Sequence, residues 1–424
     1  MLDIKFIREN PKKVKEACDK KNVNNGDSLV DQILDLDIRK RSLLTSLEAL
    51  RAKQNKFTKS ASAKNSGETM DDIDKAKKNK LEIKTLEPDL QETEKKLEEL
   101  LLQLPNIPFD DVPVGKDDTQ NVVLRKVGKL PKFGFKEKDY MELGKDLDLI
   151  DTERASKVAG SRFGYLKSEM VLLEFALVNF AMEVARKKGF IPIIPPVMLK
   201  EQMARGTGYF ELGDEKEAYY LPEDKMYLAG TSEQSLIAMR ADETLALDDL
   251  PLRYIAFSTC FRREAGSYGK DTKGILRVHQ FDKVEMVVFS KPEDSKKEHT
   301  LLLSIEEELM KKLGLPYQVI NICTGDLGRP AAKKYDIEVW LPSEKKYRET
   351  HSTSNCTDFQ ARRLNIHYKD KAGRNNFANT LNGTAFAIGR TLIAILENYQ
   401  QKDGSVKVPK VLQKYTGFKV IKKK

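Results

Sequence analysis

The sequence contains few cysteines, and they are far apart. Its 424 residues include only Cys18, Cys260, Cys323 and Cys356, and no Cys-x-x-Cys pair. Structural zinc sites usually draw on closely spaced cysteine or histidine ligands, so this spacing argues against a structural zinc. Free thiols in a reducing compartment are the simplest interpretation.

Long apolar segments are also missing. The most apolar stretch, residues 170–182, contains Glu174 and Asn179 and is shorter than the roughly 20 residues that a membrane-spanning helix needs. The first ten residues are charged from Asp3 onward and have no signal-peptide core. We therefore expect a cytoplasmic protein that does not enter a membrane.

Neither common glycine-rich nucleotide-binding motif is present. The chain has no G-x-x-x-x-G-K-[ST] loop, since residues 269–271 lack the hydroxyl residue and the upstream glycine. It also has no G-x-G-x-x-G fingerprint after an apolar strand. A bound nucleotide would need another arrangement of residues.

Charge, in contrast, is abundant. Charged residues make up 33% of the chain and apolar residues 40%, which is typical of a globular protein, and the length favours two or three domains. The net charge of +9 is spread over many lysines. It is compatible with a polyanionic partner and equally with a solvated lysine-rich surface.

Two long segments near the N-terminus have the spacing of a coiled coil. Their core positions recur at alternating three- and four-residue steps. They are Ile33, Leu36, Leu43, Leu47 and Leu50 in the first segment, where Lys40 interrupts one position, and Ile83, Leu86, Leu90, Thr93, Leu97, Leu100 and Leu104 in the second. The serine-, glycine- and lysine-rich residues 58–72 between them indicate a turn. The pattern predicts an antiparallel helical arm on the order of 45 Å long, bent at Pro88.

The distal half of this arm is basic. Residues 49–67 contain no aspartate or glutamate, and their five cations are Arg51, Lys53, Lys56, Lys59 and Lys64. Such a cluster suits phosphate contacts with a nucleic acid. A solvated coiled-coil face or a dimerisation element would give the same pattern, so both interpretations stay open at this point.

Beyond the arm, the pattern changes to mixed helices and strands. Residues 251–264 and 277–290 are predicted as two strands around a loop, and residues 383–399 as a buried helix. Strands in hairpins, with helices between sets, predict an α+β fold with an antiparallel sheet. We assign a helical arm at 1–104, a proline-rich linker at 105–119 and a catalytic domain at 120–424.

Charged residues at the end of the predicted hairpin could hold an anionic ligand. Arg262 and Arg277 can bind a carboxylate or phosphate, Glu264 can accept from an exocyclic amine, and Phe281 offers a stacking face. Glu285 could bind an ammonium or a hydroxyl group. A surface hairpin with incidental charges is the competing interpretation.

Further along the chain, other residues strengthen the first interpretation. Glu349 and Ser352 are oxygen donors of the kind that coordinate Mg²⁺ beside phosphates. Arg390 lies in an otherwise apolar segment, where an arginine usually needs a partner. Thr231 and Glu233 add a small polar turn.

These motifs together resemble the seryl-tRNA synthetase family of the bacterial and eukaryotic type. The similarity covers nearly the whole chain, in the order TSE (231–233), FRREAGSYGKDTKGILRVHQFDKVE (261–285), KKYDIE (333–338), SNCTDFQARRLNI (354–366) and TLNGTAFAIGRTLIAILENYQ (380–400). It implies a class II synthetase domain with an antiparallel sheet, and an N-terminal coiled-coil arm that grips the long variable arm of serine tRNA. It also implies a homodimer that uses ATP and Mg²⁺.

The activity implied is that of a serine–tRNA ligase, which forms seryl-adenylate and passes serine to the 3′ end of serine tRNA, or of selenocysteine tRNA where a host has one. Two rivals are a ligase that charges a carrier protein and a catalytically inactive RNA-binding relative. The long arm argues against the first. The presence of Arg262, Glu264, Arg277, Glu285, Glu349 and Arg390 argues against the second.

The resemblance also implies roles for single residues. Arg262 would bind the serine carboxylate and the α-phosphate, Arg277 the γ-phosphate and Glu264 the adenine amine, while Phe281 and Arg390 would enclose the adenine. Of these, Arg262, Arg277 and Arg390 would be catalytic. The implied serine contacts, besides Arg262, are Thr231, Ser232, Glu233, Glu285 and Thr384.

Glu349 and Ser352 would hold Mg²⁺. The rest of the implied ATP site is Arg263, Val278, His279, Gln280, Thr350 and His351. Thr350, His351, Thr353 and Arg329–Pro330 depart from the usual residues of the family. Alternation along the strand favours His351 facing the core or the surface.

Overall fold

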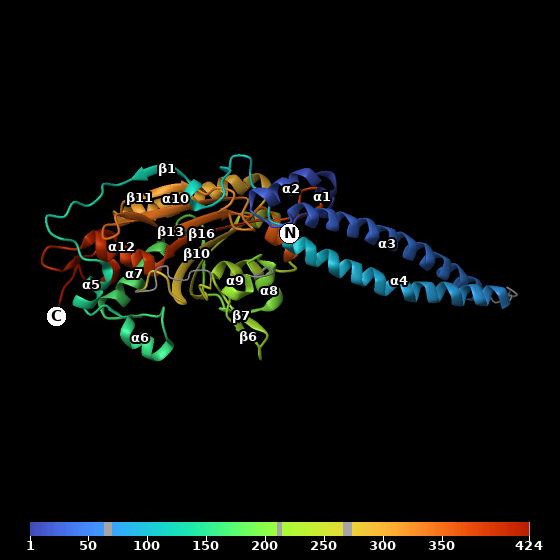
Figure 1. Ribbon diagram of the computed structural model, residues 1–424, viewed down its shortest axis with the longest axis horizontal. Helices are drawn as coiled ribbons and strands as arrows, with labels where there is room; N and C mark the ends of the chain where they lie inside the picture. Colours follow the sequence, from blue (N-terminus) through green and yellow to red (C-terminus); the bar gives the residue numbers. More distant parts are fainter. Residues whose placement is uncertain (63–69, 210–213, 266–273, 424) are drawn as a thin grey trace. The chain divides into compact units, whose positions relative to one another are not determined.

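A computed structural model gives the fold. It describes all residues except 63–69, 210–213, 266–273 and 424. The chain divides into two units, Met1–Pro105 and Asn106–Lys424 (Figure 1). Each has its own set of elements and is described by itself.

The first unit consists of helices, and its bounds are α1 Ile4–Glu9, α2 Pro11–Lys20, α3 Gly26–Ser62 and α4 Met70–Gln103. Figure 1 shows α3 and α4 side by side. Ile33, Leu47, Leu90 and Leu97 are buried along their seam, so the predicted coiled-coil arm is confirmed. Helix α4 continues through Pro88.

Near its distal end the arm has a polar layer. The Asn79 side chain, 6% exposed, donates to the Leu50 carbonyl at 3.0 Å and to Gln54 Oε1 at 2.8 Å. Lys53 at this layer and Lys56 and Lys59 beyond it are exposed. Arg51 is also exposed and pairs with Glu87 of α4 at 2.8 Å. Lys64 lies outside the described residues.

The second unit is built on an eight-stranded sheet. Its strands, in spatial order, are β1 Val122–Val127, β11 Tyr317–Asn321, β12 Lys333–Leu341, β13 Lys346–Asn355, β16 Asn379–Ala387, β10 Gln280–Ser290, β9 Leu252–Phe261 and β4 Ile191–Ile193. All neighbours pair antiparallel except β4 and β9. The predicted α+β class with an antiparallel sheet is confirmed.

Helices cover one face of this sheet and leave part of the other face for the site. Helices α7 Glu169–Arg186, α10 Ser295–Leu313 and α12 Ile388–Tyr399 share one large core with the sheet. A smaller core on the opposite face includes residues of α9 Ser232–Ala238. Alternating residues of β10 divide between the two cores, Met286 and Val288 in the first and Val287 and Phe289 in the second, as the period of two requires.

Shorter elements complete the second unit. They are α5 Tyr140–Asp146, β2 Ile150–Asp151, α6 Thr152–Ala159, β3 Tyr165–Leu166, β5 Met198–Lys200, α8 Glu201–Gly206, β6 Tyr220–Leu221, β7 Met226–Leu228, β8 Thr244–Leu245, α11 Phe359–Arg363, β14 His367–Lys369, β15 Asn375–Phe377, β17 Val406–Lys407, α13 Gln413–Thr416 and β18 Val420–Ile421. All four cysteines are free and buried. Within the described part of the chain, no helix is long and apolar enough to cross a membrane.

The structure corrects one predicted element. Residues 383–387 are the end of strand β16, and helix α12 begins only at Ile388. Residues 383–389 contain a single polar side chain, Thr384, which is too few to distinguish a period of two from one of 3.6. The strand is central in the sheet, where both faces are buried.

The segment predicted as a linker is folded against the second unit. The Asn106 side chain donates to the carbonyls of Pro330 and Cys356, both at 2.8 Å. Asp111 pairs with Lys333 at 2.5 Å. Residues from 106 onward therefore belong structurally with the sheet.

Candidate active site

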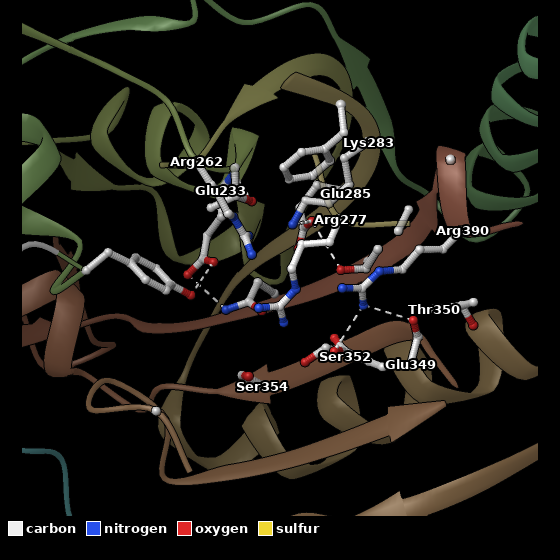
Figure 2. A pocket seen from close by; sticks show the side chains of 18 of the residues that line it. Glu233, Arg262, Arg277, Lys283, Glu285, Glu349, Thr350, Ser352, Ser354 and Arg390 are labelled. Carbon is white, nitrogen blue, oxygen red and sulfur yellow. Dashed lines mark hydrogen bonds and ion pairs between the residues drawn. The ribbon is translucent and has the colours of Figure 1, made fainter. Parts of the chain in front are cut away.

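A cavity of about 370 Å³ opens over the sheet face that the large helices do not cover. Its walls come from the β9–β10 hairpin, from β13 and β16, and from the start of α12 (Figure 2). The lining includes most of the predicted residues: Thr231, Glu233, Arg262, Glu264, Arg277, Val278, Phe281, Glu285, Glu349, Thr350, Ser352, Thr384 and Arg390.

One end of the cavity is a small polar pocket around Glu285. Its carboxylate forms a buried ion pair with Lys283 and accepts a hydrogen bond from Thr384 Oγ1 at 3.3 Å. Lys283 and Glu285 share a face of β10, because side chains two residues apart on a strand point the same way. A hydroxyl or ammonium group of a small ligand would find a charged, desolvated partner here.

Glu233 forms the wall next to this pocket. It accepts hydrogen bonds from the Tyr209 hydroxyl at 2.7 Å and from the Gln360 and Asn382 side-chain amides, both at 2.9 Å. Burial raises the pKa of Glu233 to about 7, and the nearby charge of Glu285 adds to the shift. Thr231 caps α9 by accepting from the Glu233 backbone N–H at 3.3 Å.

Three arginines reach into the rest of the cavity (Figure 2). Arg262 donates through Nε to the Gly230 carbonyl at 3.1 Å, and its guanidinium lies 5.3 Å from the centre of the Phe281 ring. Arg277 pairs with Glu264 at 3.2 Å. These contacts hold two forked cations at one end of the β9–β10 hairpin, where they could bind phosphate or carboxylate oxygens.

Arg390, from the first turn of α12, completes the cationic set. It donates to the Glu349 carbonyl at 2.9 Å and to its carboxylate at 3.1 Å. Burial of the Glu349 carboxyl opposes ionisation, but Arg390 and Lys334 outweigh it and hold the pKa below its usual range. The carboxylate is therefore ionised at neutral pH.

A β-bulge brings Glu349 and Ser352 to the same cavity. Residues three apart on a regular strand face opposite sides. On β13, however, Ile337 of β12 pairs with His351 and Glu338 pairs with Glu349, so Thr350 is an extra residue that re-aims its neighbours. The result is an ionised carboxylate and a hydroxyl in one wall, an oxygen donor set that suits Mg²⁺.

Comparison with known proteins identifies the family. A family-wide sequence model described as the seryl-tRNA synthetase N-terminal domain matches residues 1–108, and one described as the tRNA synthetase class II core domain (G, H, P, S and T) matches residues 219–399. The serine–tRNA ligase of Thermobifida fusca is 47% identical over 422 residues, covering 99% of both chains. The chain belongs to the seryl-tRNA synthetase family.

Solved structures agree with this assignment. A seryl-tRNA synthetase from Pyrococcus horikoshii, complexed with ATP, superposes with a TM-score of 0.93 at 44% identity and covers 99% of both chains. The cytoplasmic serine–tRNA ligase of Naegleria fowleri, in complex with AMP, gives 0.88 at 34% identity, covering 100% of this chain and 99% of that one. The second unit is therefore a class II synthetase core.

Five residues predicted for the synthetase site are placed elsewhere. Among the described residues, the cavity lining does not include Ser232, Arg263, His279, Gln280 or His351. Ser232 is fully buried in α9. Arg263 and His279 line a second cavity, and Gln280 lines a third.

His351 lies in the core behind the synthetase site. It is 1% exposed, its Nδ1 is 2.8 Å from Thr350 Oγ1, and its ring meets Phe386 edge to face at 5.6 Å. The alternation argument, which favoured a position away from the site, agrees with this placement. The hydroxyls of Thr350 and Thr353, which depart from the family pattern, donate to the carbonyls of Ile337 and Asn382.

The position of His351 predicts a dependence of stability on pH. Burial lowers its pKa to about 3, against about 6.5 in the unfolded chain. Between these values the unfolded state binds more protons, so stability is lost as the pH falls. At pH 5 the loss is about 2 kcal/mol.

In denaturant titrations, His351→Leu should therefore lose about 2 kcal/mol less than the parent between pH 7.5 and pH 5. Only the difference between the two pH values is compared, so a packing change at the site cancels. Equal losses in the two proteins would show that His351 does not stay neutral in the fold.

Sequence reasoning also missed residues of the synthetase site. Lys283 could have been found, because it lies two residues before Glu285 on the same strand. Tyr209 and Asn382 could not, because each reaches Glu233 from a distant part of the chain. Lys334 lines the wall beside Glu349 and was visible only as part of the KKYDIE motif.

Proposed function

We propose that this chain is a serine–tRNA ligase that forms seryl-adenylate from serine and ATP and then transfers the seryl group to the 3′ end of serine tRNA. The supporting observation is the single cavity in which Arg262, Arg277 and Arg390 lie beside the Glu233–Glu285–Thr384 pocket. Serine-dependent exchange of pyrophosphate into ATP tests the first step. No exchange by the folded protein would refute the proposal.

Serine fits the polar end of the cavity by its chemistry. Its hydroxyl and ammonium groups match the carboxylates of Glu285 and Glu233, and Thr384 adds a hydroxyl contact. Its carboxylate would then point to Arg262. This orientation directs the serine carboxylate toward the part of the cavity where the three arginines converge.

ATP would occupy that part of the cavity. Phe281 and Arg390 would enclose the adenine ring, Glu264 would accept from its amine, and Arg277 would bind the γ-phosphate. In the free protein Arg277 and Arg390 pair with Glu264 and Glu349, so nucleotide binding would change these partners. The resting pairs keep both cations ordered before ATP arrives.

The reaction itself would need position and charge more than proton transfer. An oxygen of the serine carboxylate attacks the α-phosphorus in line, the bond to the β-phosphate oxygen breaks, and pyrophosphate leaves. Arg262 would stabilise the charge that develops on the α-phosphate, and the cavity would supply the alignment. Bound at Glu349 and Ser352, Mg²⁺ would neutralise phosphate charge.

In the second step, a hydroxyl of the terminal ribose of tRNA attacks the carbonyl carbon of the adenylate, and AMP leaves. The cations of the arm would bind phosphates of the tRNA. The family match at residues 1–108 favours tRNA over a carrier protein as acceptor. Where the host has a selenocysteine tRNA, it would be a substrate too.

We also propose a cytoplasmic homodimer. Helix α7 and the nearby chain expose large apolar side chains, with Leu172 50%, Phe175 52% and Ile194 86% exposed. Contiguous exposed apolar residues mark interaction surfaces. A second copy of the chain would cover them, and sedimentation would measure the state.

Serine selectivity is expected to depend on Glu285. A site that hydrogen-bonds a hydroxyl rejects an analogue without one by about 10⁴-fold, because its buried polar groups are left unpaired. Glu285→Gln should reduce the preference for serine over alanine by about 10²-fold or more on that scale. The ratio of kcat/KM for the two amino acids in pyrophosphate exchange measures it.

A matched control is Glu298→Gln, which changes another buried glutamate in an ion pair, with Arg253 at 2.7 Å, outside the cavity lining. This control should leave the ratio unchanged. An unchanged ratio in Glu285→Gln as well would remove Glu285 from serine recognition.

A further inference from the structure

A second cavity, of about 710 Å³, lies beside the candidate active site. Its lining combines the rings of Tyr219, Tyr220, Tyr227 and His279 with the guanidinium of Arg263. The proposed chemistry of serine activation uses none of the three tyrosines. The cavity therefore needs its own explanation.

The rings and the guanidinium hold one another in place. The Arg263 guanidinium lies 4.9 Å from the centre of the Tyr219 ring, and Arg263 Nε donates to the Ala218 carbonyl at 2.9 Å. The ring centres of Tyr220 and Tyr227 are 4.7 Å apart. Because these flat groups are already ordered, stacking a further ring on them costs little conformational entropy.

The two cavities lie on opposite sides of the same two backbone segments. Of the consecutive residues 262 and 263, Arg262 lines the first cavity and Arg263 the second. Val278 and His279 divide in the same way. The two pairs are joined, since the Arg262 N–H donates to the His279 carbonyl at 2.9 Å and His279 Nδ1 lies 3.0 Å from the Arg262 carbonyl.

Aromatic rings beside a cation are the usual means of holding unpaired bases of a single RNA strand. Lys216 adds an exposed positive charge at the edge of the cavity. An RNA strand that reached the first cavity along these two backbone segments would place one of its preceding unpaired bases next to Tyr219 and Arg263.

We infer that the second cavity is a stacking site for an unpaired base near the 3′ end of the tRNA. The inference rests on the proposed function, because it takes tRNA as the acceptor. The site positions the acceptor strand for the second step and has no part in the formation of the adenylate.

The test replaces Tyr219 in the full-length protein. Tyr219→Leu keeps an apolar side chain and removes the aromatic face, while Tyr219→Phe keeps the face. Loss of one base–aromatic stack predicts a fall in kcat/KM for tRNA of about 5- to 150-fold in the leucine variant. The phenylalanine variant should stay near the parent, as should Tyr347→Ala, a control tyrosine that lines neither cavity.

Two further measurements separate this inference from its alternatives. Serine-dependent pyrophosphate exchange should be the same in Tyr219→Leu as in the parent, and so should the salt dependence of tRNA binding, since no charge changes. An equal loss of exchange would assign the cavity to ATP and overturn the inference. Parent-like tRNA kinetics in Tyr219→Leu would also overturn it.

A fluorescence measurement tests the inference without catalysis. A tRNA transcript with 2-aminopurine at one of its unpaired 3′ positions should lose fluorescence on binding the parent, at one position only, and Tyr219→Leu should restore it. Absence of quenching at every position would overturn the inference. A parent that quenches but lacks exchange would count against the proposed function alone.

Discussion

Replacing Arg262 with alanine is expected to lower serine-dependent pyrophosphate exchange by about 10²- to 10³-fold, the size of effect found when a preorganised donor to a developing charge is removed. Contacts with Gly230 and Phe281 hold Arg262 between the proposed serine and ATP regions, where the α-phosphate would develop charge. Initial rates at saturating serine and ATP measure the loss.

A matched control is Arg374→Ala. Its side chain is 79% exposed and pairs with Asp370 on a surface hairpin, and the exchange rate should not change. Circular dichroism and thermal melting would show that both variants fold. Near-normal exchange from folded Arg262→Ala would exclude this residue from the site.

Removal of the N-terminal unit, residues 1–105, is expected to abolish tRNA charging while exchange persists. The residues proposed to bind serine and ATP all follow residue 230, and the large core of the second unit is drawn from residues after 142. Without the cations that we propose to bind tRNA phosphates, the protein should aminoacylate tRNA about 10³-fold more slowly, or slower still, at moderate salt. Exchange and aminoacylation are measured on the same preparation.

Charge reversal in the full-length chain sharpens this test. Changing Lys53, Lys56 and Lys59 to glutamate should weaken tRNA binding. The slope of the logarithm of the binding constant against the logarithm of the salt concentration should become shallower by about 0.7 to 0.9 for each phosphate that the variant no longer binds. Reversal of Lys12, Lys13 and Lys20, exposed on α2, is the matched control. Full charging by the shortened protein would favour the alternative, a solvated coiled-coil face.

The sequence predicted those parts of the fold whose pattern is regular over many residues. The arm follows from a heptad pattern that continues for several turns in each helix, and Ile33, Leu47, Leu90 and Leu97 are buried as that pattern requires. The β9–β10 hairpin follows from two long apolar strands around a polar loop. Residues 383–387 were misassigned, because five residues with one polar side chain, Thr384, are too few to show a period that distinguishes strand from helix.

The site was predictable where its residues share a strand or a recognised motif. Phe281 and Glu285 lie on one face of β10, and the resemblance supplied Thr384 and Arg390. The surroundings of Glu233 were not predictable, because Gln360 and Asn382 are 127 and 149 residues away in the chain. Arg263 and His279, which the resemblance implied for the ATP site, line the second cavity, since a motif does not say on which side of the backbone each neighbour falls. The functional boundaries at 104 and 119 stay predictions.

The cavity is nearly balanced in charge before any substrate arrives. Five cationic side chains and four carboxyl groups line its described part, which leaves formally one positive charge. Nearly all of the net +9 of the chain must therefore reside elsewhere. Capture of a small anion becomes an exchange of partners at contact distance, which depends on geometry and little on ionic strength. The charges that attract a large polyanion therefore lie on the outer surface, where salt screens their attraction beyond a Debye length of about 8 Å.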